Sequence, residues 1–244
     1  MSTINLNWKS PDDQWNLVKL CVNNAFTTFI EGAPGLGKTY AGLYSVNNEQ
    51  RVYAITFNPD QAVQELQGTY IPTESGAWVW RDGPILQAFR NGGILVLNEM
   101  GRASDAVLDF LIAITDSKDS AKITLMNGET VTRHPDLRIV ATSNSPFAKL
   151  PEALQDRFEA RLKVTAPNPS IIEELNRQIP GLGDMVQRSY GKEGKNPAIT
   201  SREAFAYAKL KKIMGHDNAA MAVWGNSAPE IAAEVKLAQE LTVK

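Results

Sequence analysis

The chain has 244 residues, of which 43% are hydrophobic and 21% charged, and this composition excludes intrinsic disorder as its main organisation. Its 25 Lys and Arg residues against 27 Asp and Glu residues leave a formal charge of -2, which supplies no overall basic field for holding nucleic acid. The single cysteine, Cys21, excludes a disulfide framework and favours a reducing compartment. With neither a signal-peptide pattern nor an 18-residue apolar run, we expect a cytoplasmic protein without membrane contact.

The first two-thirds of the chain alternate between strand and helix patterns. A helix is predicted from about Pro11 to Asn24, because Ser10 can cap it and proline suits its first position. Short apolar runs rich in β-branched residues predict strands, and helical spacing separates them at 60–67, 84–90 and 104–115. This alternation predicts an α/β fold, a parallel sheet flanked by helices, whose five strands lie at 25–31, 52–57, 94–98, 137–144 and 160–164.

Two hairpins are predicted as insertions near 70–82 and 122–133. The second has alternating residues around Asn127-Gly128, the strongest short-range hairpin signal. The first carries Trp78 and Trp80, whose spacing places them on one side of a strand. We expect these tryptophans to form a small packed cluster, and the alternative is a surface that grips a client.

The composition changes after Val164. A linker is predicted at 166–170, and the β-branched runs stop beyond it. Thr200 and Glu203 have the spacing of a capping box that opens a helix. We therefore expect an α/β nucleotide-binding domain at 1–166 and a small helical lid domain at 167–244.

The sharpest motif follows the first predicted strand and matches G-x-x-x-x-G-K-[ST]. Glycines at this spacing let backbone N–H groups close around phosphate oxygens at a helix N-terminus. Lys38 would then reach the β- and γ-phosphates of ATP, and the Thr39 hydroxyl would bind Mg²⁺. The alternative is a glycine turn with a solvated lysine. We assign nucleotide binding to Gly32, Ala33, Pro34, Gly35, Leu36, Gly37, Lys38, Thr39 and Tyr40.

Polar residues end two further strands, at the sheet edge where open α/β sheets bind ligands. Glu99 is the candidate for polarising the attacking water, and Asn98 would lie beside the metal. Asn144 could orient the same water or contact the γ-phosphate. The alternatives are simple strand caps at 98 and 99 and turn chemistry at 144.

The segments GAPGLGKT, ILVLNE, IVATSN and LPEALQDRF, in this order, resemble Walker A, Walker B, sensor 1 and the arginine-finger helix of AAA+ ATPases. The stretches NEMGRASDAVLDFL and HPDLRIVATSNSP resemble the MoxR branch, especially its CbbQ, NirQ and GvpN-like members. The resemblance is dense from about residue 30 to 165.

This resemblance implies a homo-oligomeric ring, hexameric in this family, with ATP and Mg²⁺ at subunit interfaces. It implies that Glu99 activates water, Asn144 is sensor 1, Arg157 is the finger that enters a neighbour's site, and Arg202 is sensor 2. Arg102 falls where MoxR proteins commonly carry an interface arginine. For each arginine the alternative is an ordinary surface charge.

Walker B ordinarily reads Asp-Glu, whereas here Asn98 precedes Glu99. An amide oxygen lacks the negative charge that attracts Mg²⁺, so weak metal affinity or slow turnover is expected.

Three functions stay open. The first is a MoxR-type ATPase that remodels a protein client, with a von Willebrand factor A domain partner. The second is a nucleic-acid motor, which the hairpin tip at 127–129 disfavours because it carries no cation. The third is a nucleotide-binding structural subunit without meaningful turnover.

Overall fold

The computed structural model describes residues 10–44, 51–190 and 199–242, and its contacts divide the chain into two compact units. The larger unit comprises Asn16–Gly32 and Lys38–Lys163, and the smaller comprises Met1–Trp15, Ala33–Gly37 and Val164–Lys244. The predicted domains 1–166 and 167–244 begin and end in residues outside those described, and the boundary between them stays a prediction. No described helix is both long and apolar enough to cross a bilayer.

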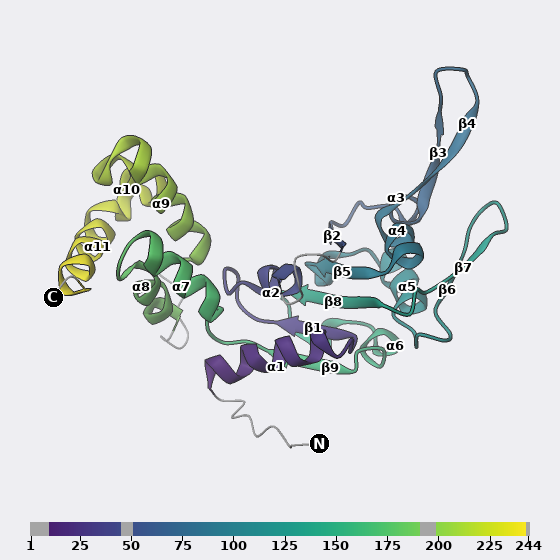
Figure 1. Ribbon diagram of the computed structural model, residues 1–244, viewed down its shortest axis with the longest axis horizontal. Helices are drawn as coiled ribbons and strands as arrows, with labels where there is room; N and C mark the ends of the chain where they lie inside the picture. The colour runs from purple at the N-terminus through teal and green to yellow at the C-terminus, as the bar shows by residue number, and fades with distance from the viewer. Residues whose placement is uncertain (1–9, 45–50, 191–198, 243–244) are drawn as a thin grey trace. The chain divides into compact units, whose positions relative to one another are not determined.

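A five-stranded parallel sheet forms the centre of the larger unit (Figure 1). Its strands lie in the order β2-β5-β8-β1-β9, and each neighbouring pair is parallel. The predicted fold class is therefore confirmed. The strands are β1 (Thr28–Glu31), β2 (Val52–Thr56), β5 (Gly93–Asn98), β8 (Leu137–Ser143) and β9 (Ala160–Lys163).

Both faces of the sheet are covered, which explains the continuous apolar runs. Leu95 and Leu97 belong to a core cluster that includes buried residues of α4 (Pro84–Asn91) and α5 (Asp105–Ile114). Val96 faces the other way, because a Cβ built on Gly42 of α2 (Lys38–Tyr44) would lie 3.2 Å from its side chain. Successive residues of a strand point to opposite faces, so one apolar run fills both cores.

Short elements complete the larger unit and connect the strands. Because the strands are parallel, their carboxyl ends, which include Asn98 and Ser143, share one edge of the sheet, and their amino ends share the other. The remaining elements are α3 (Val63–Gln67), η1 (Met100–Arg102), η2 (Phe147–Lys149) and α6 (Glu152–Gln155); α1 (Pro11–Asn23) contributes residues to both units.

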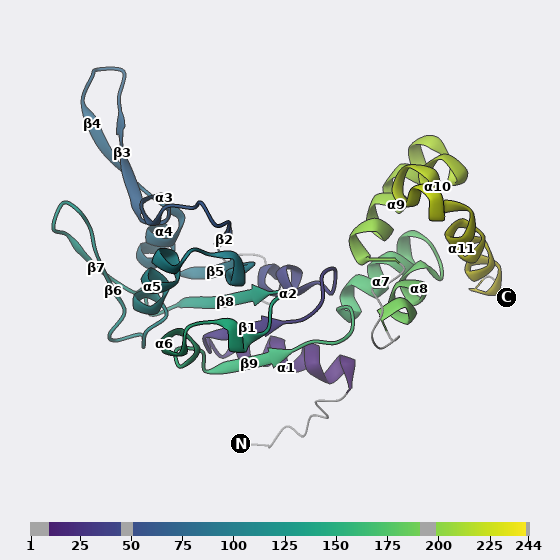
Figure 2. The same ribbon diagram turned by 180° about the vertical axis from the view of Figure 1, so that it is seen from behind.

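Two hairpins project from the larger unit on the same side in both views (Figures 1 and 2). They are formed by β3 (Gly68–Pro72) with β4 (Trp78–Asp82) and by β6 (Lys122–Thr124) with β7 (Thr130–Thr132), at the predicted positions. The prediction that Trp78 and Trp80 form a packed cluster is wrong. Trp80 packs edge-on against Tyr70, whereas the Trp78 side chain is 65% exposed.

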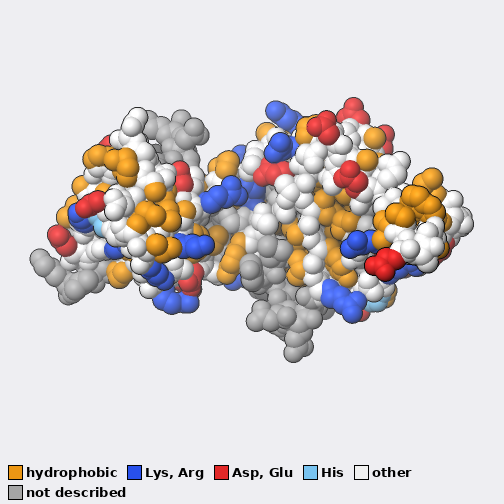
Figure 3. Space-filling model, turned by 90° about the horizontal axis from the view of Figure 1, so that it is seen from above, with side chains coloured by type: hydrophobic (Ala, Val, Ile, Leu, Met, Phe, Trp, Pro, Cys, Tyr) orange, Lys and Arg blue, Asp and Glu red, His pale blue; other side chains and the backbone are white. Residues whose placement is uncertain are grey.

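Several exposed apolar side chains of this unit lie on the hairpins, and Figure 3 shows apolar side chains over this part of the surface and elsewhere on the unit. Trp78, Val79 and Tyr70 are exposed on the first hairpin, and Met126, at 81%, is exposed on the second. Arg90 in the last turn of α4 binds the base of the first hairpin and the turn of the second. Its Nε donates to Asp82, and its Nη1 and Nη2 donate to the two carboxylate oxygens of Glu129.

In the smaller unit, the described residues beyond residue 168 are mainly helical. Its core surrounds the fully buried Tyr207, which packs against Trp224. The predicted capping box is present: the Thr200 hydroxyl accepts from the Glu203 N–H, and the Glu203 carboxylate accepts from the Thr200 N–H. The helices are α7 (Pro169–Gln178), α8 (Leu182–Tyr190), α9 (Ser201–Met214), α10 (His216–Trp224), η3 (Gly225–Ser227) and α11 (Ala228–Thr242).

Candidate functional site

The glycine-rich loop joins β1 to α2, and its conformation requires glycine. Gly35 and Gly37 have φ values of 80° and 88°, which L side chains rarely adopt. Space is also lacking, because a Cβ on Gly35 would lie 2.3 Å from the Tyr190 Oη and one on Gly37 would lie 2.4 Å from the Ile171 Cδ1. Residues 33–37 and both of these neighbours belong to the smaller unit.

Tyr190 fixes this loop from the end of α8. Its Oη donates to the Pro34 carbonyl at 2.8 Å. Burial raises the pKa of Tyr190 to about 12, so the hydroxyl remains a proton donor at neutral pH. Sequence patterns did not indicate this contact, since Tyr190 follows Pro34 by 156 residues.

Lys38 begins α2 and is only 6% exposed. Its Nζ donates to the Gly32 carbonyl at 2.9 Å and to the Asn144 Oδ1 at 2.8 Å. Burial lowers the pKa of Lys38 to about 8, an effect that the nearby Glu99 carboxylate partly opposes. A phosphate anion beside this ammonium would stabilise its charged form.

Asn144 connects Lys38 to Glu99. Its Nδ2 donates to the Glu99 Oε1 at 2.7 Å, while its Oδ1 accepts from the Lys38 Nζ. These two partners fix the orientation of the amide, because an ammonium only donates and a carboxylate only accepts. Glu99 itself has φ of 55°, a left-handed conformation that is uncommon for a residue with a side chain. Such strained positions cluster at functional sites.

Asn98 lies beside Thr39. Its Oδ1 accepts from the Thr39 Oγ1 at 2.9 Å and from the Thr142 Oγ1 at 3.2 Å. Among the described residues, no three His, Cys, Asp or Glu side chains converge as a metal-binding group. The oxygens of Asn98 and Thr39 fit Mg²⁺ in donor type, but both are neutral, so nucleotide phosphates would have to supply most of the negative charge.

The larger unit thus brings together Lys38, Thr39, Asn98, Glu99 and Asn144 at the carboxyl edge of its sheet. All five of these residues were predicted from the sequence. The Thr142 hydroxyl was not, although the alternation of the strand would have placed residue 142 on the same side as residue 144.

The predicted arginines lie elsewhere. Arg157 precedes β9 and lines a cavity with Thr27, which precedes β1, so it lies at the amino edge of the sheet. Arg102 ends η1 and is exposed. Arg202 is exposed in the first turn of α9, two residues after Thr200, whose Cβ lies 3.2 Å from the position of a Cβ on Gly35.

Comparison with known families decides the classification. Residues 27–158 match the family described as AAA domain (dynein-related subfamily). The chain belongs to this AAA family. The match runs from the residue before β1 to the residue after Arg157, so it covers the sheet edge that carries Lys38 and Asn98, and it supports an ATPase.

Curated relatives confirm the predicted resemblance to the MoxR branch. The AAA chain is 26% identical to protein NorQ of Paracoccus denitrificans over 175 residues, 70% of this chain and 64% of that one. It is 29% identical to the denitrification regulatory protein NirQ of Pseudomonas aeruginosa over 54% of this chain and 50% of that one. It is also 30% identical to midasin of Dictyostelium discoideum, over 61% of this chain but 2% of midasin. The AAA chain thus spans less than two-thirds of each of these relatives.

Solved structures agree on the fold of the AAA chain. NtrX from Brucella abortus has a TM-score of 0.53 at 16% identity, with 92% of this chain and 66% of that one covered. A point mutant of RuvB from Thermotoga maritima has a TM-score of 0.54 at 14% identity, with 95% and 71% covered. At these identities the likeness concerns the fold alone.

Proposed function

We propose that this AAA protein hydrolyses ATP in a ring oligomer, a hexamer as is common in its family, and uses the hydrolysis to remodel or activate a protein client. In this proposal Lys38 and the loop bind the phosphates, Thr39 and Asn98 hold Mg²⁺, Glu99 polarises the attacking water, and Asn144 senses the γ-phosphate. When bound, Mg²⁺ would neutralise charge on the phosphates.

The position of Arg157 carries the proposal of an oligomer. Lys38 follows the carboxyl end of β1, whereas Arg157 lies at the amino edge of the same sheet. The four residues of β1 separate the two edges by about 13 Å, at about 3.3 Å per residue. An arginine there lies at the opposite edge of the sheet from the nucleotide site of its own copy, so its role as a finger requires the site of a second copy.

Arg202 joins the proposal as sensor 2. It lies in the first turn of α9, where a cation opposes the helix macrodipole. The Cβ of Thr200, the cap residue of the same helix, lies 3.2 Å from the position of a Cβ on Gly35 within the smaller unit, which supports a role of Arg202 near the glycine loop. Arg102 is proposed only as an interface residue, because it is exposed and lies close to Glu99 in the sequence.

The hairpins favour a protein client over nucleic acid. They expose large apolar side chains, among them Trp78 and Met126, and exposed apolar patches mark protein-binding surfaces. The tips, residues 73–77 and 126–129, carry no lysine or arginine that could contact phosphates. The MoxR resemblance adds a partner with a von Willebrand factor A domain and a cytoplasmic location, the latter also favoured by the single buried thiol of Cys21.

A second candidate function follows from Asn98. Its neutral amide stands where a carboxylate ordinarily attracts Mg²⁺, and it already accepts two hydroxyl hydrogen bonds. This arrangement favours a nucleotide-binding subunit with slow turnover or none. Measurement of steady-state ATPase with and without DNA separates the three functions: stimulation by DNA indicates a motor, and binding without turnover indicates a structural subunit.

The oligomer is tested by mixing two inactive variants. Arg157→Ala and Lys38→Ala subunits should each lose activity alone and regain part of it when mixed, because some interfaces then pair an intact loop with an intact arginine. Such a finger contributes about 10³–10⁵ in rate, so even a minority of repaired interfaces is measurable. Arg177→Ala, which removes a surface cation paired with Glu174, serves as the control. Absence of complementation in verified mixed oligomers would refute action in trans.

A further inference from the structure

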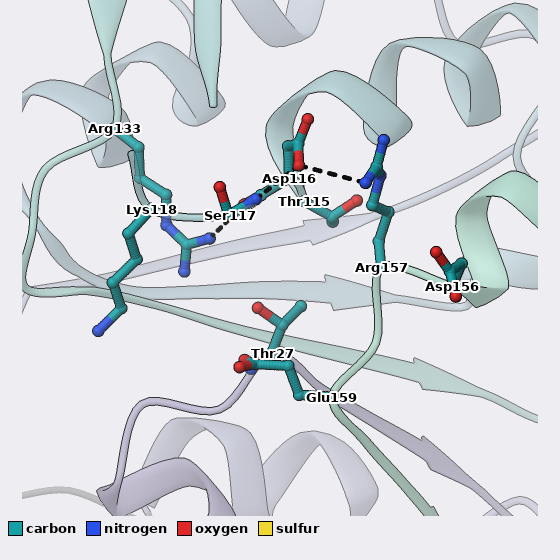
Figure 4. A pocket seen from close by; sticks show the side chains of 9 residues that line it. All are labelled: Thr27, Thr115, Asp116, Ser117, Lys118, Arg133, Asp156, Arg157 and Glu159. Carbon is teal, nitrogen blue, oxygen red and sulfur yellow. Dashed lines mark hydrogen bonds and ion pairs between the residues drawn. The ribbon is translucent and has the colours of Figure 1, made fainter. Parts of the chain in front are cut away.

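Arg157 lines a cavity at the amino edge of the sheet, and the other lining residues come from several segments of the larger unit (Figure 4). The cavity volume is about 290 Å³, and Thr27, Glu159 and Arg133, which line it, come from the segments that precede β1, β9 and β8. The Glu159 carboxylate accepts from the Thr27 N–H at 2.8 Å, which joins two of these segments. This cavity is therefore separate from the carboxyl edge that carries the candidate nucleotide site.

Asp116 is the partner of Arg157 in this cavity. The Arg157 Nη1 lies 3.2 Å from the Asp116 Oδ1, and both side chains are only partly exposed, at 36% and 31%. The same Oδ1 accepts from the Ser117 N–H at 2.7 Å, so the main chain orients the carboxylate. Figure 4 shows Asp116 and Arg157 directed toward each other, from the segment after α5 and from the segment after α6.

The location of Asp116 is not explained by local helix stability. It follows Thr115, the residue that caps the carboxyl end of α5. A negative charge at this end of a helix opposes the macrodipole and is unfavourable by itself. The cation of Arg157 offsets this cost.

Arg133 holds the main chain beneath Asp116. It is 5% exposed, and its Nη1 and Nη2 donate to the carbonyls of Asp116, at 3.1 Å, and Leu137, at 3.0 Å. Burial lowers the pKa of Arg133, and Glu159 partly opposes this effect. A buried guanidinium between two carbonyls ties the end of α5 to the start of β8, so the Asp116 carboxylate has a fixed position relative to the sheet.

We propose that Asp116 is a positioning residue for Arg157: it holds the guanidinium at the amino edge in the orientation from which it acts on nucleotide bound by a second copy. The inference rests on the proposed function, in which Arg157 acts in trans. A guanidinium has five N–H donors, so Asp116 can keep one while others contact a phosphate. Asp116 thereby acts through Arg157 and touches no substrate itself.

Asp116→Asn tests the proposal, because it removes the charge and preserves the shape. The expected kcat of the full chain falls about two- to fivefold, the value of an ion pair of about 0.4–1 kcal/mol, while ATP affinity is unchanged. Asp119→Asn, which removes the same charge from an exposed position in the same loop, should leave both parameters unchanged. Asp116→Glu, which keeps the charge, should retain more activity than Asp116→Asn.

A double mutant separates positioning from general structural support. If Asp116 acts through Arg157, Asp116→Asn should cause no further loss in an Arg157→Ala background. An additive loss, or unchanged or increased activity of Asp116→Asn alone, would overturn the inference. If Arg157→Ala itself leaves ATPase unchanged, the proposed function of Arg157 fails instead, and the two failures are thus distinguishable. Thermal unfolding of each variant identifies any loss of folded protein. If Asp116→Asn does not fold, the activity that Asp116→Glu retains decides the outcome.

Discussion

The buried ammonium of Lys38 makes nucleotide affinity and protein stability respond to pH in opposite directions. The residue is 6% exposed, and its pKa is lowered from 10.5 to about 8 in the nucleotide-free chain. Bound phosphates would favour the ammonium and raise this pKa again. Above pH 8, binding must therefore take up a proton, and affinity falls up to about tenfold for each further pH unit.

The magnitude follows from the fraction of protonated Lys38. With a pKa of about 8 this fraction falls from about 0.9 at pH 7 to about 0.03 at pH 9.5. The Kd for ATP should therefore rise about 30-fold over this interval, about 2 kcal/mol of binding free energy. A non-hydrolysable ATP analogue, titrated by calorimetry at constant Mg²⁺, measures this change without turnover.

Stability has the opposite sign. The unfolded chain keeps the ordinary pKa of 10.5, so between pH 8 and 10.5 it binds more protons at Lys38 than the folded chain does. The free energy of unfolding of the nucleotide-free protein should rise across this window, by about 3 kcal/mol in total. Below pH 8 Lys38 is charged in the folded chain, so the desolvation of this charge then lowers the free energy of unfolding by its full amount.

Lys38→Ala is the matched control for both measurements. It should bind ATP weakly at every pH, because phosphate charge then lacks its cationic partner, and its stability should lack the rise between pH 8 and 10.5. If the Kd of the unmodified chain is constant from pH 7 to 9.5, or if both chains show the same stability profile, then Lys38 does not have the environment described here.

Three further predictions concern other sites. Asn98→Asp places a carboxylate beside the Thr39 hydroxyl, so the Mg²⁺ concentration for half-maximal ATP binding should fall at least about fivefold. The metal-free protein should lose stability, because the new carboxylate lacks a cation. An unchanged midpoint in a Mg²⁺ titration would refute the metal role. Thr200→Ala removes the capping box and should lower the free energy of unfolding in urea by about 1 kcal/mol. Trp78→Ser should change the free energy of unfolding by less than about 0.5 kcal/mol and leave basal ATPase intact, because the ring is exposed. Trp80→Ser should lower the free energy of unfolding by about 2 kcal/mol or more, because this ring is packed. Equal losses would contradict the different packing of the two rings.

The sequence by itself determined the features that depend on neighbouring residues. The five strands follow from short apolar runs, the second hairpin from Asn127-Gly128, and the capping box from Thr200 and Glu203. The glycine loop was recognised from the spacing of its glycines, Lys38 and Thr39, and the φ of 80° at Gly35 is the physical reason for a glycine there. Local patterns also placed Asn98 and Asn144 at the ends of strands, and parallel strands bring such ends together.

Only the tertiary structure decided which distant residues meet. The pairs Asp116 with Arg157 and Tyr190 with Pro34 join residues far apart along the chain, and no spacing rule connects them. The same holds for the two tryptophans of the first hairpin, which share one side of β4 but differ in exposure, because Trp80 reaches the core and Tyr70 while Trp78 lies beyond it. Burial and pairing depend on what the rest of the fold places opposite a side chain, and a pattern of neighbouring residues does not carry that information.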